Sequence, residues 1–169
     1  MRLHRFLIAG LILLFDQATK AIVVERFTAQ TAIPVIPGLF RLVLVENAGM
    51  AFGLLNDSPS PLVFGLLTLV SAVLLGFVAY LLWTSQTPSV LGGFGLALIL
   101  GGAAGNVVDR LARGKVIDFL DFYLGSHHWP AFNIADSAIV LGVGLMVGEM
   151  LFAKKPAQDK RAPAAEGKA

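Results

Sequence analysis

Two aspartates, Asp118 and Asp136, flank an aromatic-rich segment that joins two strongly apolar stretches of the chain. Asp118 follows one apolar run and Asp136 opens the next, so both carboxyl groups should lie at about the same membrane boundary. An ionised carboxylate beside hydrocarbon is costly unless it is paired or used. Two neighbouring carboxyl groups can share one proton, one acting as acid and the other as base, and so activate water for attack on a peptide bond. The pair favours a membrane-embedded aspartic peptidase.

Each aspartate also has a simpler interpretation. Asp136 lies in the first turn of an expected helix, where an acid complements the helix dipole, and Asn133 is a good helix cap. Asp118 could be a solvated acid in a loop. Catalysis is the better joint interpretation because both carboxyl groups converge on the same boundary.

The composition is that of an integral membrane protein. Of 169 residues, 56% are hydrophobic and 14% are charged, with a mean hydropathy of +0.77, whereas soluble domains carry about 25% charged residues. The absence of cysteine excludes disulfides, thiolate catalysis and cysteine-ligated metals. The three histidines are too few and too badly spaced to favour a metal site: His4, His127 and His128. We therefore expect no metal and no cofactor.

Four stretches approach the roughly 20 apolar residues that a membrane span needs. They are expected at residues 6–24, 61–83, 90–108 and 134–153. An even number of spans places both termini on one side, and basic residues at both ends place that side in the cytoplasm: Arg2, Arg5, Lys154, Lys155, Lys160 and Arg161. The basic ends favour an anionic lipid surface over nucleic acid as partner.

Three cations fall on the opposite, outer side: Arg110, Arg113 and Lys115. A need for positive charge beside the carboxylates would explain this exception to the charge rule. We expect one membrane-embedded domain over residues 1–153 and a disordered cytoplasmic tail over residues 154–169, which are charged and rich in alanine and proline.

The largest outer loop, residues 25–60, should contain β-structure. Pro34 and Pro37 exclude a helix, and residues 39–45 are rich in strand-forming residues. The aromatic residues of segment 120–130 are typical of an interfacial belt. Glycines four apart predict close helix packing at two places: Gly101 with Gly105, and Gly144 with Gly148.

Polar residues in the spans need a reason. Asp16 and Lys20 are four apart and share a helical face, either as a structural ion pair inside the bundle or as a pair that shapes the site. Lys20 is close enough to the outer end to reach the interface. Asn106 and Arg110 also share a face and could address a peptide carbonyl or a developing oxyanion. Arg113 lies beyond the apolar run, and we expect no role for it.

Five motifs together resemble the lipoprotein signal peptidases (signal peptidase II) of bacteria. They are DQATK at 16–20, NAGMAF at 47–52, GGAAGNVVDR at 101–110, VIDF at 116–119 and PAFNIADS at 130–137. They occur in family order and with family-like spacing between about residues 6 and 153. One mild departure is Met50, where the family usually has alanine.

The resemblance implies a multi-pass enzyme of the bacterial inner membrane with its active site at the periplasmic face. It would remove signal peptides from prolipoproteins by cleaving before the diacylglyceryl-modified lipobox cysteine, with no cofactor and no obligate protein partner. The implied fold is an all-α membrane protein with four transmembrane helices, a small periplasmic β-cradle and a short periplasmic helix. Asp118 and Asp136 correspond to the catalytic pair. The family's other polar positions around the site match Asp16, Lys20, Asn47, Asn106, Asp109, Arg110 and Asn133.

Two other functions stay open on the residues alone. Ser137 could be a nucleophile with Lys20 as its base, although the sequence offers no convincing partner. Alternatively, Asp16, Lys20 and the aspartates could form the proton relay of a small transporter. A transporter should place polar residues near the middle of several spans, whereas most of them cluster here at one end of the spans.

Overall fold

The computed structural model describes residues 2–48, 61–84 and 89–152. These residues contain four long helices, each apolar and long enough to cross a membrane. They are α1 (Arg2–Arg26), α2 (Pro61–Thr84), α3 (Val90–Arg113) and α4 (Ile134–Phe152). The prediction of four helices able to span a membrane is thereby confirmed. The predicted disordered tail and the Gly49–Phe52 part of the second motif lie outside the described residues.

The third helix extends beyond the expected end at residue 108. It continues to Arg113, and within this last part Asp109 and the partly buried Arg113, one helical turn apart, form an ion pair. Gly114, with a φ of 71°, then ends the helix in the left-handed conformation that glycine adopts most easily. This extra turn carries polar side chains past the apolar span.

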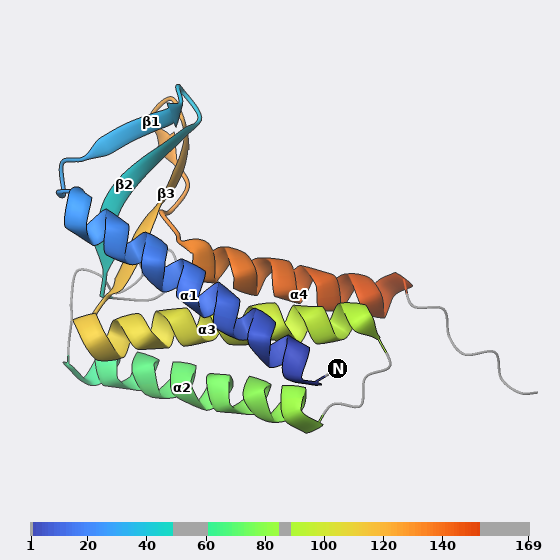
Figure 1. Cartoon of the computed structure of the whole chain (residues 1–169). Helices are drawn as coiled ribbons and strands as arrows, with labels where there is room; N and C mark the ends of the chain where they lie inside the picture. The colour runs from blue at the N-terminus through green and yellow to red at the C-terminus, as the bar shows by residue number, and fades with distance from the viewer. Residues whose placement is uncertain (1, 49–60, 85–88, 153–169) are drawn as a thin grey trace, which may run out of the picture.

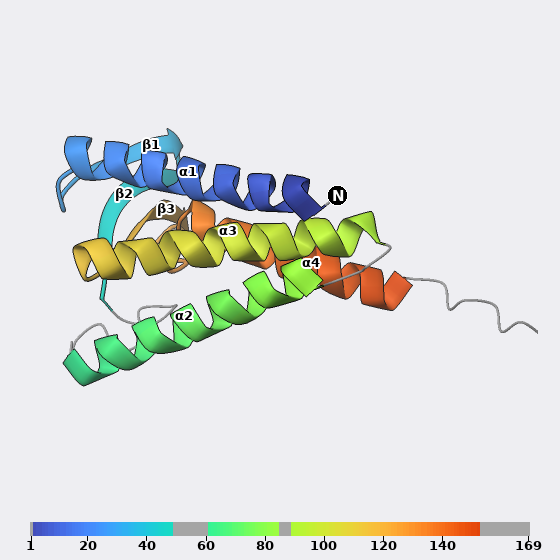
Figure 2. The same ribbon diagram turned by 60° about the horizontal axis from the view of Figure 1, so that its bottom comes forward.

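The helices run alternately up and down, so the N-terminus and the end of α4 lie at one end of the bundle and a β-sheet lies at the other (Figure 1). The central element is α3, which packs against all three other helices. Figure 2 shows α3 between α1 and α2. Part of the second half of α3, including Val107 and Asp109, is therefore buried.

Glycines on α3 allow this central position. A Cβ at Gly101 would lie 2.6 Å from the Ala9 carbonyl oxygen of α1, and one at Gly105 would meet the Asp16 carboxylate. The predicted close packing at this pair is confirmed. The same prediction for Gly144 and Gly148 is wrong, since a Cβ at either would meet no described atom within 4 Å. The face of α4 that touches α3 contains Gly142 instead, about 200° around the helix from Gly144.

The sheet has four antiparallel strands in the order β1 (Ala32–Ile36), β2 (Phe40–Asn47), β3 (Val116–Leu124) and β4 (His127–His128). The strand predicted over 39–45 is confirmed. Pro34 lies in edge strand β1, where a missing N–H is tolerated. Among the described residues every helix is one of the four long ones, so the short periplasmic helix stays a prediction.

Segment 120–130 is not simply the interfacial belt that its aromatic residues suggested. Its first half continues β3, and a turn with Gly125 at φ 61° leads into β4. The Phe122 ring stacks on Phe40 of β2, with ring centroids 4.7 Å apart, and on Phe132, at 5.9 Å. The aromatic residues pack within the sheet because the neighbouring strand and the segment before α4 offer rings to stack on.

A bulge in β3 decides which side chains share a face. The N–H groups of Phe119 and Leu120 both donate to the Phe132 carbonyl oxygen, at 3.0 and 2.8 Å. Both side chains join the apolar cluster around Val23 of α1. The strict alternation of a strand is broken here, so Asp118 and Asp121 both point to the opposite face of the sheet.

Candidate active site

Asn133 joins the two aspartates. Its Nδ2 donates to Asp118 Oδ1 at 2.7 Å, and its Oδ1 accepts a hydrogen bond from the backbone N–H of Asp136 at 2.9 Å. Asn133 is fully buried and Asp118 is only 2% exposed, whereas Asp136 is half-buried. The residues that the sequence placed at one boundary are thus held around a single amide, at the junction of β3 and α4.

A further amide donates to each carboxylate. Asn47 Nδ2 donates to Asp118 Oδ2 at 3.1 Å, and Asn106 Nδ2 donates to Asp136 Oδ1 at 2.8 Å. Asn47 has the character of a turn residue in the sequence, but it ends β2 opposite Val116. The amide of Asn106 thus donates to a carboxylate of the pair, and its expected contact with a substrate carbonyl stays a prediction. Both asparagines orient the carboxyl groups without adding charge.

The pKa of Asp118 is raised by its surroundings. Burial, and after it the nearby negative charge of Asp136, raise the pKa of its carboxyl group from 3.8 to about 6. The hydrogen bonds from Asn47 and Asn133 act in the opposite direction because they stabilise the ionised form. A carboxyl group with a pKa of this size can both hold and release a proton under physiological conditions.

Beneath the two aspartates lies a buried charge cluster centred on Lys20. Lys20 Nζ lies 2.9 Å from Asp16 Oδ2, 2.8 Å from Asp109 Oδ2 and 3.1 Å from Asn106 Oδ1. The expectation that Lys20 reaches the interface is wrong, since its side chain is fully buried. Three acceptors inside the bundle satisfy all three ammonium hydrogens, so the charge needs no water.

The cluster holds the backbone just before each aspartate of the pair. Asp16 Oδ1 accepts a hydrogen bond from the N–H of Ala135 at 2.9 Å, and Asp109 Oδ2 accepts one from the N–H of Ile117 at 3.2 Å. Lys20 bridges these two carboxylates. The Asp16–Lys20 pair is therefore both a structural ion pair and a support of the site.

Sequence reasoning missed two members of this cluster. Arg113 Nη1 donates to Asp109 Oδ1 and, at 3.0 Å, to Gln17 Oε1. Gln17 Nε2 donates to Asp109 and to the Gly105 carbonyl oxygen, both at 3.1 Å. The expectation that Arg113 has no role is thus wrong. Its spacing of four residues from Asp109 was the available signal, and it was overlooked because the helix was expected to end at residue 108.

Comparison with known proteins shows the family of the chain. A family model described as signal peptidase (SPase) II matches residues 8–152. The chain belongs to the signal peptidase II family. It is 47% identical over 151 residues to the lipoprotein signal peptidase of Desulforapulum autotrophicum, covering 89% of this chain and 93% of the relative. It is 43% identical over 157 residues to that of Solibacter usitatus, covering 93% and 96%.

Solved structures show the same fold. A bacterial membrane enzyme determined by the in meso method at 2.3 Å resolution matches with a TM-score of 0.80 and 27% identity, over 94% of both chains. A second, at 1.9 Å resolution, matches with a TM-score of 0.75 and 28% identity, over 89% of this chain and 94% of the other. Signal peptidase II enzymes are aspartic peptidases that remove signal peptides from prolipoproteins, so this membrane protein is a hydrolase of that type.

Within this signal peptidase II site, Arg110 is the cation without a fixed partner among the described residues. Its half-buried guanidinium interacts electrostatically with Asp136, Asp118 and Asp109, but it forms no ion pair or hydrogen bond with the described part of the chain. In this it differs from Lys20 and Arg113, whose side chains form ion pairs and hydrogen bonds with described residues.

The rival functions find little support in the geometry. Ser137 Oγ donates to the Asn133 carbonyl oxygen at 2.9 Å, while the contacts of Lys20 are with Asp16, Asp109 and Asn106. A serine peptidase would need Lys20 beside Ser137. The cluster also takes its polar residues from the second half of α1, the end of α3 and the start of α4, which disfavours a proton relay that runs through the bundle.

Proposed function

We propose that Asp118 and Asp136 are the catalytic pair of this signal peptidase II enzyme. The observation that carries the proposal is the position of the two carboxyl groups around Asn133, each with its own amide donor. The substrate is a prolipoprotein whose lipobox cysteine carries a diacylglyceryl group, and the bond cleaved lies just before that cysteine. The reaction needs no metal or cofactor.

The mechanism follows from two carboxyl groups that share one proton. The ionised carboxylate takes a proton from water as the water oxygen attacks the scissile carbonyl carbon. The protonated carboxyl polarises the carbonyl oxygen and stabilises the tetrahedral intermediate. When the C–N bond breaks, the leaving amine takes a proton from the pair, which returns to its singly ionised state. The proton belongs to the pair, because coupled carboxyl groups titrate together.

Arg110 has a separate role in this mechanism. Its guanidinium lies within electrostatic reach of both aspartates and has no fixed partner among the described residues. It can donate to the substrate backbone near the scissile bond or to the developing oxyanion. The other polar residues support the pair: Asp16, Lys20, Asn47, Asn106, Asp109 and Asn133.

The location of the site suits a lipid-anchored substrate. The pair lies where the helices meet the sheet, at the end of the bundle opposite the N-terminus. In the proposed topology both termini are cytoplasmic and this end faces the periplasm of the bacterial inner membrane. A diacylglyceryl anchor would hold the scissile bond at the membrane boundary, and the signal peptide helix would lie along the bundle. Membrane lipids are then the only other partner.

Cleavage of a synthetic diacylglyceryl prolipoprotein peptide by the purified enzyme tests the proposal. Asp118→Asn and Asp136→Asn keep the shape of each side chain but remove its titratable proton, so each should lower kcat/KM by roughly four orders of magnitude. The double variant should be no worse than either single variant, because the two residues act as a unit. The same peptide with an unmodified cysteine should be cut far more slowly.

Ser137→Ala is the matched control in this experiment and should keep most of the activity, since among the described residues its hydroxyl bonds to the Asn133 carbonyl oxygen and to no carboxylate. Normal turnover by a folded Asp118→Asn or Asp136→Asn enzyme would contradict the assignment of these two residues as the catalytic pair. A folded but inactive Ser137→Ala enzyme would favour the serine mechanism.

A further inference from the structure

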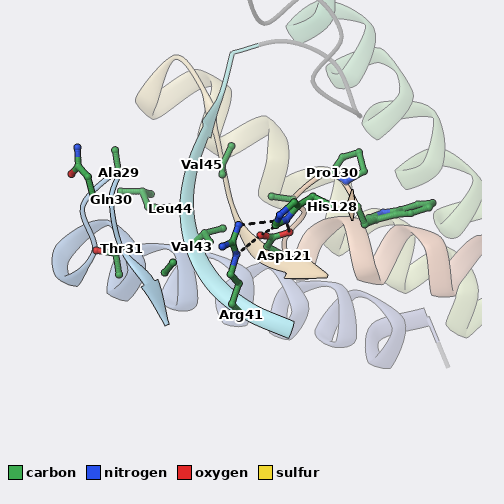
Figure 3. Close-up of a pocket in the computed structure, with 13 residues that line it drawn as sticks. Ala29, Gln30, Thr31, Arg41, Val43, Leu44, Val45, Asp121, His128 and Pro130 are labelled. Atoms are coloured by element: carbon green, nitrogen blue, oxygen red, sulfur yellow. Dashed lines mark hydrogen bonds and ion pairs between the residues drawn. The ribbon is translucent and has the colours of Figure 1, made fainter. Parts of the chain in front are cut away.

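A pocket that the proposed mechanism does not use lies on the sheet (Figure 3). It has a volume of about 420 Å³, and neither Asp118 nor Asp136 lines it. Its lining comes from the connection between α1 and β1, from all four strands and from the segment between β4 and α4, and includes Thr31, Arg41, Val43, Asp121, His128 and Pro130. Figure 3 shows the side chains of Arg41, Asp121 and His128 directed toward one another.

The guanidinium of Arg41 is held rigidly at this pocket. Its Nε donates to Asp121 Oδ2 at 2.6 Å, its Nη2 lies 3.4 Å from His128 Nδ1, and its Cζ lies 5.0 Å from the centre of the Tyr123 ring. The Asp121 side chain is only 7% exposed, whereas that of Arg41 is 32% exposed. A guanidinium has five N–H donors, and these contacts occupy only some of them. A preorganised donor edge therefore faces the pocket.

This pocket lies on the same face of the sheet as Asp118. In the β2–β3 register, Val45 pairs with Asp118 and Arg41 pairs with Asp121. Because of the bulge at Phe119 and Leu120, both aspartates project from that face. Asp121 follows Asp118 by three positions along β3, so their Cα atoms are roughly 10 Å apart at most. An extended peptide covers this distance in two to three residues.

The direction of β3 indicates which part of the substrate reaches the pocket. β3 starts at the end of α3 and runs away from the helices (Figure 1). The apolar signal peptide must stay beside the helices in the membrane, so the chain on the other side of the scissile bond leads outward along the sheet. This step rests on the proposed function, with the scissile bond at Asp118 and Asp136.

We propose that the Arg41 pocket binds the second or third residue of the released lipoprotein, counting the lipid-modified cysteine as the first. It favours a side chain that accepts hydrogen bonds, above all a carboxylate, because a fixed guanidinium presents donors that match its two oxygens. A lysine at the same place meets the positive guanidinium and is disfavoured. The pocket thus selects substrates by the residues that follow the cleavage site.

Three diacylglyceryl peptides that differ only at the third residue after cleavage, with Asp, Gly or Lys there, test this inference. The unaltered enzyme should cleave the Asp peptide with a kcat/KM about tenfold above that of the Lys peptide, the size expected for a charge-assisted hydrogen bond. The double variant Arg41→Gln/Asp121→Asn removes both charges and leaves no unpaired buried carboxylate. It should lose the preference, so that kcat/KM becomes the same for the Asp and the Lys peptide.

Arg26→Gln is the matched control, since Arg26 is an exposed arginine at the end of α1 that does not line the pocket. This variant should keep the preference. If the unaltered enzyme cleaves all three peptides equally, or if the double variant keeps the preference, the pocket does not read these residues. If none of the lipid-modified peptides is cleaved, the proposed function itself fails, and that result is distinct from equal cleavage. The same series with the altered residue at the second position completes the test.

Discussion

At the residue scale, the site depends on amide side chains around the two carboxyl groups. Asn47, Asn106 and Asn133 donate hydrogen bonds to Asp118 or Asp136, while the cations Lys20 and Arg113 bond to Asp109 and its neighbours. An amide orients a carboxylate and stabilises its charge modestly, whereas a directly bonded cation would hold it ionised. The arrangement leaves the catalytic pair able to keep a shared proton.

The pKa of Asp118 gives a prediction for pH dependence. Because burial raises that pKa to about 6, kcat/KM should fall as pH rises above about 6 and the shared proton is lost. Asn47→Ala removes a donor that stabilises the ionised form of Asp118, so its pKa should rise further and the decline should move to higher pH. The pH profile of kcat/KM on the lipid-modified peptide measures this shift. Glu25→Gln, at an exposed position, should leave the profile unchanged.

The sign of the same effect can be checked on stability. The raised pKa means that the folded protein holds the Asp118 proton more tightly than the unfolded chain does. Protonation of Asp118 therefore stabilises the folded protein at low pH, and this contribution is lost as pH rises from about 4 through about 6. The loss amounts to about 3 kcal/mol. The unfolding free energy in detergent should show this decline in the parent protein but not in Asp118→Asn.

For the activity profile, a decline of kcat/KM that moves to lower pH in Asn47→Ala would contradict the role given to Asn47.

At the element scale, α3 is the platform of the site. Asn106, Asp109 and Arg113 recur at three- and four-residue spacing along it, so they share one side of the helix. This side meets Asp16 and Lys20 of α1 and the start of α4. The charge cluster can form only because small residues let α1 and α4 approach α3 closely.

A pair of glycine substitutions tests this packing. In Gly101→Ala the new Cβ would lie 2.6 Å from the Ala9 carbonyl oxygen and 2.8 Å from Ile12 Cβ, so α1 and α3 must separate. We expect a loss of about 1–3 kcal/mol in unfolding free energy, with reduced activity because Lys20 moves with α1. In Gly144→Ala the Cβ enters open space, and the better helix propensity of alanine should stabilise by up to about 1 kcal/mol.

Thermal or denaturant unfolding in detergent, together with cleavage assays, measures both effects. Equal stability of the two variants would show that α1 and α3 do not pack through Gly101 as described.

At the scale of the whole molecule, the site lies at the junction of two structures of different character. The helices form the apolar body, and the sheet covers the end opposite the N-terminus (Figure 1). The proposed catalytic pair takes Asp118 from the sheet and Asp136 from the start of α4. A substrate anchored in the lipid and extending into water would pass this junction.

The membrane orientation is a prediction at this scale. With both termini cytoplasmic, alkaline phosphatase fused after Gly125 should be active, because the turn between β3 and β4 would be periplasmic. Fusion after Ser85 should be inactive, because the α2–α3 connection would be cytoplasmic. Measured phosphatase activity in whole cells, normalised to the amount of fusion protein, decides the matter. The reverse pattern would move the aspartates to the cytoplasmic side and contradict the proposed site of cleavage.

The sequence by itself determined the features that depend on local composition and spacing. Runs of about 20 apolar residues identified four helices, strand-forming residues identified β2, and polar residues at helix ends placed Asp118 and Asp136 at one boundary. These features follow from the hydrophobic thickness of a membrane and from backbone preferences, which need no knowledge of distant contacts. The motif order was likewise enough to indicate the family.

Only the tertiary structure decided which groups are partners. Asp16 accepts a hydrogen bond from the N–H of Ala135, 119 residues away. Lys20 is bonded to acceptors of α1 and α3 inside the bundle, although the sequence predicted that it would reach the interface. The bulge that puts Asp121 on the face of Asp118 forms where two neighbouring N–H groups of β3 share the Phe132 carbonyl oxygen. The residue pattern of β3 alone does not reveal this partner. Hydrogen-bond partners depend on which elements pack together, because a buried polar group must find its partner wherever the fold brings one within 3 Å or so.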